Sequence, residues 1–377
     1  MTSKNQTAFP GTALRKLFIP YLGMLVILLL WPFDLFKENP THWLSKENGI
    51  AFTGNGMVAT LTPIPEFCRK MKAGQGLTIE VWLSPANTTQ SGPARIISYS
   101  YDTVLRNFTL GQQGKDLVSR LRTSKTNLNG MNPDVTVENV FHATVPIHIV
   151  VTYDFIYQDI FVDGIKKIHS NTPGGDFENW DPNYYLAFGN EITWDRPWQG
   201  KILKAYMYNR PLKETEIMEN YQEGWESNNT TAKTVRGKTG LIAGFLFGEG
   251  HGNSINNIVP DESPKKLYVP RFLYNIVKPV VYLQLPADAI SHRSLLIDTI
   301  LNVFGFIPFG FLLHGRLSNR FGQTWRISAL VLVLGALVSF SAESLQYYSI
   351  SRHSSVLDVY TNTLGTGIGI IIYRFTN

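Results

Sequence analysis

The sequence is poor in cysteine and in charge. Cys68 is the only cysteine among 377 residues, which excludes an intrachain disulfide framework and a cysteine-rich zinc site. Charged residues make up 17% of the chain, and the formal net charge is only +5. The basic residues form no cluster interleaved with aromatic side chains, so we expect no nucleic-acid partner.

Sequence signatures of common enzymes are also missing. We find no Gly-x-Ser-x-Gly, no His-Glu-x-x-His, no P-loop and no glycine-rich dinucleotide turn. The histidines are scattered and lack the spacing of metal ligands. These absences leave enzymatic activity uncertain and favour a non-enzymatic role.

Long apolar stretches lie near the two ends of the chain. Residues 17–36 are nearly unbroken apolar sequence after Arg15 and Lys16, without a small-residue cleavage site. We interpret them as an uncleaved transmembrane helix, with a signal peptide as the alternative. Three further transmembrane helices are predicted at 294–313, 327–343 and 356–373, which gives a four-span α-helical bundle.

The basic residues near these spans predict their orientation. Arg15 and Lys16 precede the first span, a basic loop from Arg316 to Arg326 follows the second, and Arg374 ends the fourth. Short cytoplasmic segments carry an excess of such residues. We therefore predict a multi-pass protein of the cytoplasmic membrane, with residues 1–16 in the cytoplasm and the long middle segment outside it.

Each C-terminal span carries an acid and an amide about one helical turn apart. Spacings of three and four place both members of a pair on one helix face. In the predicted topology all three acids lie in one outer layer, beside a loop that contains Arg352 and His353. The site is either a structural clamp or a head-group or ion site that opens outward. This candidate membrane polar site consists of Asp298, Asn302, Glu343, Gln346, Arg352, Asp358 and Asn362.

Five glycines and one proline in the predicted spans indicate how the helices pack and where one of them bends or ends. Glycines allow helices in a membrane to approach closely, and five of them fall in the predicted second and fourth spans. Pro308 is expected to kink the second span or to end it early. The five glycines are Gly305, Gly310, Gly365, Gly367 and Gly369.

The middle of the chain, residues 44–268, has the pattern of an all-β antiparallel sandwich. Residues 77–83 and 147–153 alternate with period two, and Asp163-Gly164 predicts a tight hairpin turn. Further strands are expected at 185–189 and 201–209. A short helix is expected at 212–221, directly after Pro211.

Residues 48–224 resemble a laminin-G-like domain of the concanavalin A-type jelly-roll class. The resemblance is carried by LTIEVWLSP, IHIVVTYD, VDG at 162–164 and NRPL at 209–212. It implies binding of glycans or proteins, with calcium in some members. The strand LIAGFLFGEG at 241–250 follows the terminal helix instead of preceding the domain. We predict that it completes the sheet; a truncated repeat is the alternative.

Ligand residues in the sandwich are only candidates. Trp180, Tyr184, Trp194 and Trp198 are able to stack on sugar rings, although aromatic side chains of this kind also fill cores. Asp176, Asp181 and Asp195 offer oxygen ligands for calcium, although aspartates in loops also form turns.

Residues 285–374, with 17–36 as the first helix, resemble the VanZ-like family of bacterial membrane proteins. The sandwich is then an insertion between the first two spans, and residues 269–293 form an interfacial segment. The family resemblance implies a membrane protein without a transferable mechanism. It is carried by Asp298, Asn302, FIPFG at 306–310, Glu343, Gln346, Arg352, Asp358 and NTLG at 362–365.

Three functional hypotheses follow. The first is an integral membrane protein of the cell envelope that displays a sandwich for a surface polysaccharide or an envelope protein. The alternative is an enzyme or carrier that acts on lipid-linked envelope precursors through the outer carboxylates; a proton-coupled transporter is a third option. The lipid bilayer is a partner in each case, and the sequence does not specify an oligomeric state.

Overall fold

The computed structural model describes residues 11–131, 134–171, 173–226, 238–259, 261–277, 293–349, 352 and 355–377. The chain divides into two compact units. One consists of Glu38–Phe272, and the other combines Met1–Lys37 with Leu273–Asn377.

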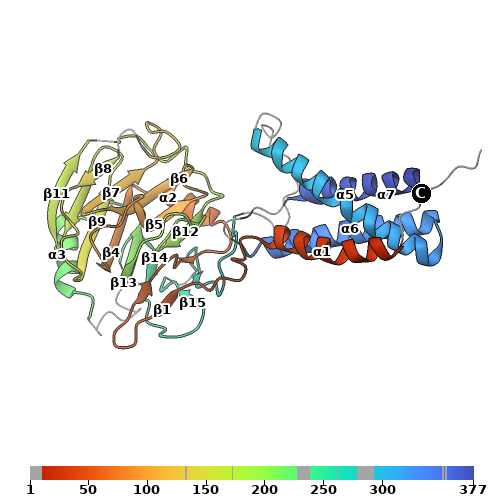
Figure 1. Ribbon diagram of the computed structural model, residues 1–377. Helices are drawn as coiled ribbons and strands as arrows, with labels where there is room; N and C mark the ends of the chain where they lie inside the picture. The colour runs from red at the N-terminus through yellow and green to blue at the C-terminus, as the bar shows by residue number, and fades with distance from the viewer. Residues whose placement is uncertain are drawn as a thin grey trace, which may run out of the picture. The chain divides into compact units, whose positions relative to one another are not determined.

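The unit Glu38–Phe272 is a sandwich of two antiparallel β-sheets (Figure 1). In the first sheet the order is β1 (Thr41–Trp43), β2 (Ile50–Phe52), β13 (Gly200–Tyr208), β4 (Leu77–Pro85), β9 (Ile147–Tyr153), β10 (Gln158–Val162) and β11 (Ile165–Ser170). In the second sheet the order is β15 (Ser254–Asn256), β16 (Lys266–Tyr268), β3 (Val58–Ala59), β12 (Tyr185–Phe188), β5 (Ala94–Ser100), β6 (Arg106–Gln113), β7 (Asp116–Leu121) and β8 (Val135–Val137).

The late strand predicted at 241–250 completes the first sheet. β14 (Leu241–Phe245) pairs with β13 from Ala205 to Tyr208, while β2 pairs with β13 from Gly200 to Ile202. Phe245 is fully buried in the main core. This part of the prediction is therefore confirmed, and β15 and β16 extend the second sheet in the same way.

Turn and cap residues explain the local structure around the first sheet. Asp163 and Gly164 both have positive φ (51° and 75°), as the predicted tight turn between β10 and β11 requires. The helix predicted at 212–221 begins later, as α3 (Glu214–Glu223). The correction has a physical cause, because the Glu216 side chain accepts a hydrogen bond from the backbone N–H of Lys213 (2.9 Å) and caps the helix there.

The other unit is α-helical and contains α1 (Gly11–Leu30), α5 (Arg293–Phe321), α6 (Trp325–Gln346) and α7 (Val356–Thr376). α1 ends before Pro32, since a residue that precedes proline avoids helical geometry. Of the two expectations for Pro308, an early end of the helix is excluded, because α5 is 29 residues long and continues through Pro308 to Phe321. Neighbouring helices allow proline inside such helices, and α7 packs closely along α5.

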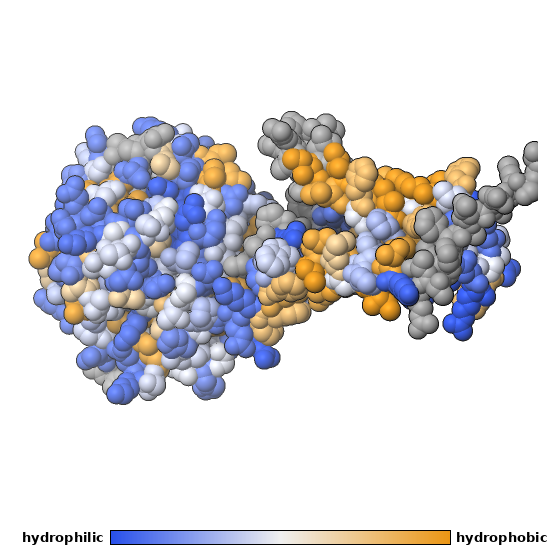
Figure 2. All heavy atoms as spheres, viewed as in Figure 1, coloured by the Kyte–Doolittle hydropathy of each residue, from blue (hydrophilic) through white to orange (hydrophobic). Residues whose placement is uncertain are grey.

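The number of apolar helices differs from the four predicted spans. In the part of the chain that the structure describes, two helical segments, Thr299–Phe321 and Trp325–Gln346, are long and apolar enough to cross a membrane. Lys16–Leu30 is a shorter apolar helix. α7 is long enough to cross a membrane, but its polar residues make it less apolar than these two segments. Figure 2 shows hydrophobic residues over much of the helical unit's surface, whereas the sandwich surface is mainly hydrophilic.

The sandwich leaves and rejoins the helical unit through adjacent chain segments. Glu38 and Phe272 form an antiparallel bridge. In the helical unit, the N–H of Leu273 donates to the carbonyl of Lys37 (2.8 Å). Adjacent ends are typical of an inserted domain. Most of the predicted interfacial segment 269–293 lies outside the described residues.

Candidate functional site

Two carboxylates of the helical unit meet the N-terminal end of α7. Glu343, near the end of α6, is 2% exposed, and its Oε2 accepts a hydrogen bond from the backbone N–H of Ser355 (2.8 Å). Asp358 lies in the first turn of α7, and its Oδ1 accepts from Asn302 Nδ2 on α5 (2.8 Å). Ser355 is the N-cap residue of α7, so Glu343 joins the end of α6 to the start of α7.

Asn362 lies one turn further along α7 and is almost completely buried. Its Nδ2 donates to Ser339 Oγ on α6 (2.8 Å), while its side-chain oxygen has no hydrogen-bond partner among the described residues. Thr366 Oγ1 donates to the Asn362 carbonyl one turn later (3.0 Å). The amide therefore joins α7 to α6, just as Asn302 joins α5 to α7.

The remaining polar residues connect α6 and the following loop to α1. Gln346 Nε2 donates to the Leu29 carbonyl (2.8 Å), and Arg352 Nε donates to the Trp31 carbonyl (3.0 Å). Arg352 thus hydrogen-bonds a backbone carbonyl and not a carboxylate. The side chain of Asp298 and the whole of His353 are not among the described parts of the structure. The convergence of Asp298 with Glu343 and Asp358 therefore stays a prediction.

Close backbone contacts hold α5 and α7 together around this network. A Cβ atom at Gly365 would lie 2.2 Å from the Val303 carbonyl oxygen, and one at Gly369 would lie 2.1 Å from that of Ile307. Gly310 is equally close to α7. The other two predicted glycines differ: Gly305 has open space, and a Cβ at Gly367 would make an ordinary contact.

The four aromatic side chains considered as candidates for sugar stacking are all buried. Trp180, Tyr184, Trp194 and Trp198 are at most 3% exposed. Trp180 Nε1 donates to the Arg122 carbonyl (2.6 Å), and Trp198 Nε1 donates to Gln112 Oε1 (2.9 Å). Their faces are covered by the protein, which fits the core-filling alternative and not sugar stacking, because stacking needs an open ring.

The three aspartates considered for calcium lie in locally hydrogen-bonded turns. Asp181 Oδ1 accepts from the N–H of Asn183 (2.9 Å), and Asp195 Oδ1 accepts from Thr193 Oγ1 (2.6 Å). Asp176 Oδ1 accepts from the N–H of Glu178 (3.2 Å). Within the described residues, no group of three or more His, Cys, Asp or Glu side chains is arranged to hold a metal ion.

One polar cluster that the sequence did not predict lies between the first sheet and α3. His148 Nε2 and Glu80 Oε1 are 2.9 Å apart, and Asn220 Nδ2 of α3 donates to Glu80 Oε2 (2.9 Å). Trp82 stacks on His148 with ring centroids 4.8 Å apart. Glu80 and His148 occupy outward positions of their strands, which alternation alone assigns to solvent; α3 covers them instead.

A second unpredicted cluster lies on the second sheet. Arg95 and Glu191 are both buried, with Arg95 Nε donating to Glu191 Oε2 (3.2 Å). Ser98 and Ser100 donate to the other oxygen of Glu191. Arg106 is also buried, and its Nε and one Nη have no partner. Burial, followed by the charge of Arg95, lowers the pKa of Arg106 to about 9.

The chain therefore contains a β-sandwich with an apolar core and two buried polar clusters, and a helical unit held by interhelical polar contacts. Residues 56–218 match the family model described as the concanavalin A-like lectin/glucanases superfamily. Residues 219–377 match the family model described as VanZ/LLP1, which begins within α3 and includes β14 to β16. The two resemblances are thereby confirmed in the predicted order. A comparison with curated proteins found no match.

The chain is also similar to solved structures, and the three described here have TM-scores of 0.36 to 0.40. One is a receptor binding domain, with 13% identity and a TM-score of 0.39, covering 49% of this chain and 45% of that one. The botulinum neurotoxin type G receptor binding domain has 14% identity, a TM-score of 0.36 and the same coverage. A protein from Bacteroides ovatus described as carbohydrate binding has 14% identity and a TM-score of 0.40, covering 60% of this chain and 58% of that one. The chain thus spans about half the length of these proteins.

Proposed function

We propose that this protein is an integral membrane protein of the cell envelope that displays a glycan-binding sandwich outside the cytoplasm. The observation that carries the proposal is the joining of a concanavalin A-like lectin region to a VanZ-like region with apolar helices. A sandwich inserted through adjacent chain ends suits display, because one short connection links it to its anchor.

The orientation follows from the charges at the two ends of the helices. Arg316 and Arg320 at the end of α5, and Arg326 at the start of α6, belong to the cytoplasmic end by the excess of basic residues there. Glu343 and Asp358 then belong to the outer end. The connection at Lys37 and Leu273 follows the outer end of α1, so the sandwich is outside.

The polar contacts between the helices favour a clamp over a catalytic or carrier site. Glu343, Asp358 and Asn362 each hydrogen-bond a group on another helix or at a helix end. Groups engaged in this way fix the packing of the bundle, since an unpaired polar group is costly in lipid. An enzyme or carrier of lipid-linked precursors remains the second hypothesis, and it rests on the unpartnered buried oxygen of Asn362.

The test uses the full chain reconstituted in lipid nanodiscs and probed on an array of bacterial surface polysaccharides. The matched control lacks residues 38–272, with Lys37 joined to Leu273 through a short linker. We expect selective retention of a polysaccharide by the full chain and none by the control. Equal binding by both proteins, or extraction of the full chain from cell membranes by alkaline carbonate, would contradict the proposal.

A further inference from the structure

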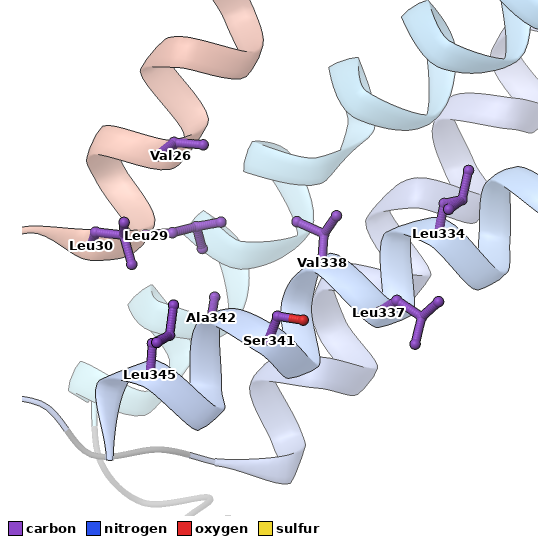
Figure 3. A pocket seen from close by; sticks show the side chains of 9 residues that line it. All are labelled: Val26, Leu29, Leu30, Leu334, Leu337, Val338, Ser341, Ala342 and Leu345. Atoms are coloured by element: carbon purple, nitrogen blue, oxygen red, sulfur yellow. The ribbon is translucent and has the colours of Figure 1, made fainter. Parts of the chain in front are cut away.

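A groove between α1 and α6 is open on the surface of the helical unit. It has a volume of about 300 Å³ and is lined by eight apolar side chains and one hydroxyl group. Figure 3 shows Val26, Leu29 and Leu30 of α1 facing the α6 residues across it. The α6 residues are Leu334, Leu337, Val338, Ser341, Ala342 and Leu345.

The surroundings of the groove point to a hydrocarbon occupant. Other apolar side chains of α1 and α6 are also exposed, including Leu28 (58%) and Val333 (54%). Exposure of this kind is costly in water and costs nothing against acyl chains. At one end of the groove, Gln346 Nε2 hydrogen-bonds the Leu29 carbonyl (2.8 Å) and holds α6 against α1.

A cation lies next to this same end of the groove. Arg352 donates through Nε to the carbonyl of Trp31, the residue that follows Leu30. Among the described residues its Nη atoms have no hydrogen-bond partner. A guanidinium group with free donors binds phosphate well, because its N–H groups match the spacing of phosphate oxygens.

We propose that the groove holds one acyl chain of an anionic phospholipid whose phosphate lies beside Arg352. The inference rests on the proposed function in one respect, the embedding of these helices in a bilayer. The apolar walls select hydrocarbon, and Arg352 selects an anionic head group. The bound lipid fills the gap between α1 and α6 and so stabilises their contact.

The first test fills the groove. Ser341 is exposed in it and contributes no core contact, so Ser341→Trp adds bulk without disturbing the fold. Val333→Trp is the matched control, because Val333 is also exposed on α6 and is not among the residues that line the groove. Full-length protein is reconstituted in nanodiscs of phosphatidylglycerol that carries a photoactivatable acyl chain, and cross-linked peptides are mapped.

We expect cross-links concentrated on residues 26–30 and 334–345, reduced roughly tenfold by Ser341→Trp and unchanged by Val333→Trp. In the second arm, Arg352→Gln should remove the preference for phosphatidylglycerol over phosphatidylcholine in the groove, a change of roughly fivefold. Arg326→Gln, at the other end of α6, should leave this preference intact.

Three outcomes would overturn the inference. Cross-links spread evenly around the helices would show an ordinary lipid-facing surface. A cross-linked dimer lost on Ser341→Trp would assign the groove to a second copy of the chain. Incorporation into nanodiscs without cross-links in the groove refutes this inference alone, whereas failure to incorporate refutes the proposed function as well.

Discussion

Glu216 shows how a single carboxylate fixes the start of α3. It accepts two hydrogen bonds from the guanidinium group of Arg210 and one from the backbone N–H of Lys213. The hydrogen bonds from Arg210 are the main reason that the pKa of Glu216 falls to about 2. A carboxylate of this kind stabilises the fold only while it is ionised.

The predicted pH dependence follows from the direction of that pKa shift. Because the folded-state pKa lies below the unfolded value of about 4.5, the stabilisation is present above pH 4.5 and is lost as the pH falls toward 2. Glu216→Gln should lower the free energy of unfolding by about 1 to 2 kcal/mol at pH 7, allowing for partial exposure. Thermal unfolding followed by near-ultraviolet circular dichroism at pH 7, 4.5 and 2.5 tests this, and a constant difference between the proteins would contradict it.

The two buried arginines of the second sheet should respond in opposite ways to loss of their charge. Arg95→Met leaves Glu191 buried without its cation, which should destabilise the sandwich by about 3 to 5 kcal/mol. Arg106→Met removes a cation that has two unpartnered nitrogens and lies near Arg95. We expect its stability to be unchanged or higher, measured by urea unfolding of both variants. An equal loss in the two variants would show that Arg106 has a counter-charge of its own.

At the residue scale, the sequence predicted which side chains share a helix face but not which partner each one takes. The spacing of Asp358 and Asn362 suggested a pair within one helix. The structure bonds Asp358 to Asn302 and Asn362 to Ser339, each on a different helix. Partners of this kind depend on how helices pack, and local spacing carries no such information. The same holds for Trp180, because the composition of a strand-rich segment does not separate core rings from exposed ones.

At the scale of elements, contact between α5 and α7 depends on specific glycines. Gly365→Ala would place a methyl group against the Val303 carbonyl, whereas Gly367→Ala would meet only Leu332 Cδ1 at 3.6 Å. We expect Gly365→Ala to destabilise the bundle by about 1 to 3 kcal/mol and Gly367→Ala to have little effect. Thermal aggregation of the two variants in detergent provides the measurement. Equal midpoints would mean that α5 and α7 move apart easily.

Sandwich strands were more predictable than the ends of the helices. Alternation and an Asp-Gly turn depend on neighbouring residues, so β4, β9 and the β10–β11 hairpin were readable from the sequence. The apolar alternation of 241–245 also predicted a place in the sheet, now seen beside β13. The predicted span at 294–313 already ran through Pro308, but the sequence left a kink and an early end open there. The extension of α5 to Phe321 was not predicted.

At the scale of the whole molecule, the orientation of the helices and the location of the sandwich can be tested in one experiment. The basic residues at one end of α5 and α6 predict a cytoplasmic position for that end and an external position for the sandwich. Cys68 is the sole cysteine and is buried, so Cys68→Ala gives a chain suited to single-cysteine labelling. Ile156, exposed between β9 and β10, and Gln323, exposed between α5 and α6, offer one site in each unit.

A membrane-impermeant maleimide should label the Ile156→Cys variant in intact cells whose outer barrier has been removed. The Gln323→Cys variant should react only after lysis, since its site belongs to the cytoplasmic end. Replacing Arg316, Arg320 and Arg326 together by Gln should make the pattern mixed, because the charge bias that orients the helices is then weakened. Labelling of Gln323→Cys before lysis, with protection of Ile156→Cys, would reverse the orientation and place the sandwich in the cytoplasm, where a surface polysaccharide cannot reach it.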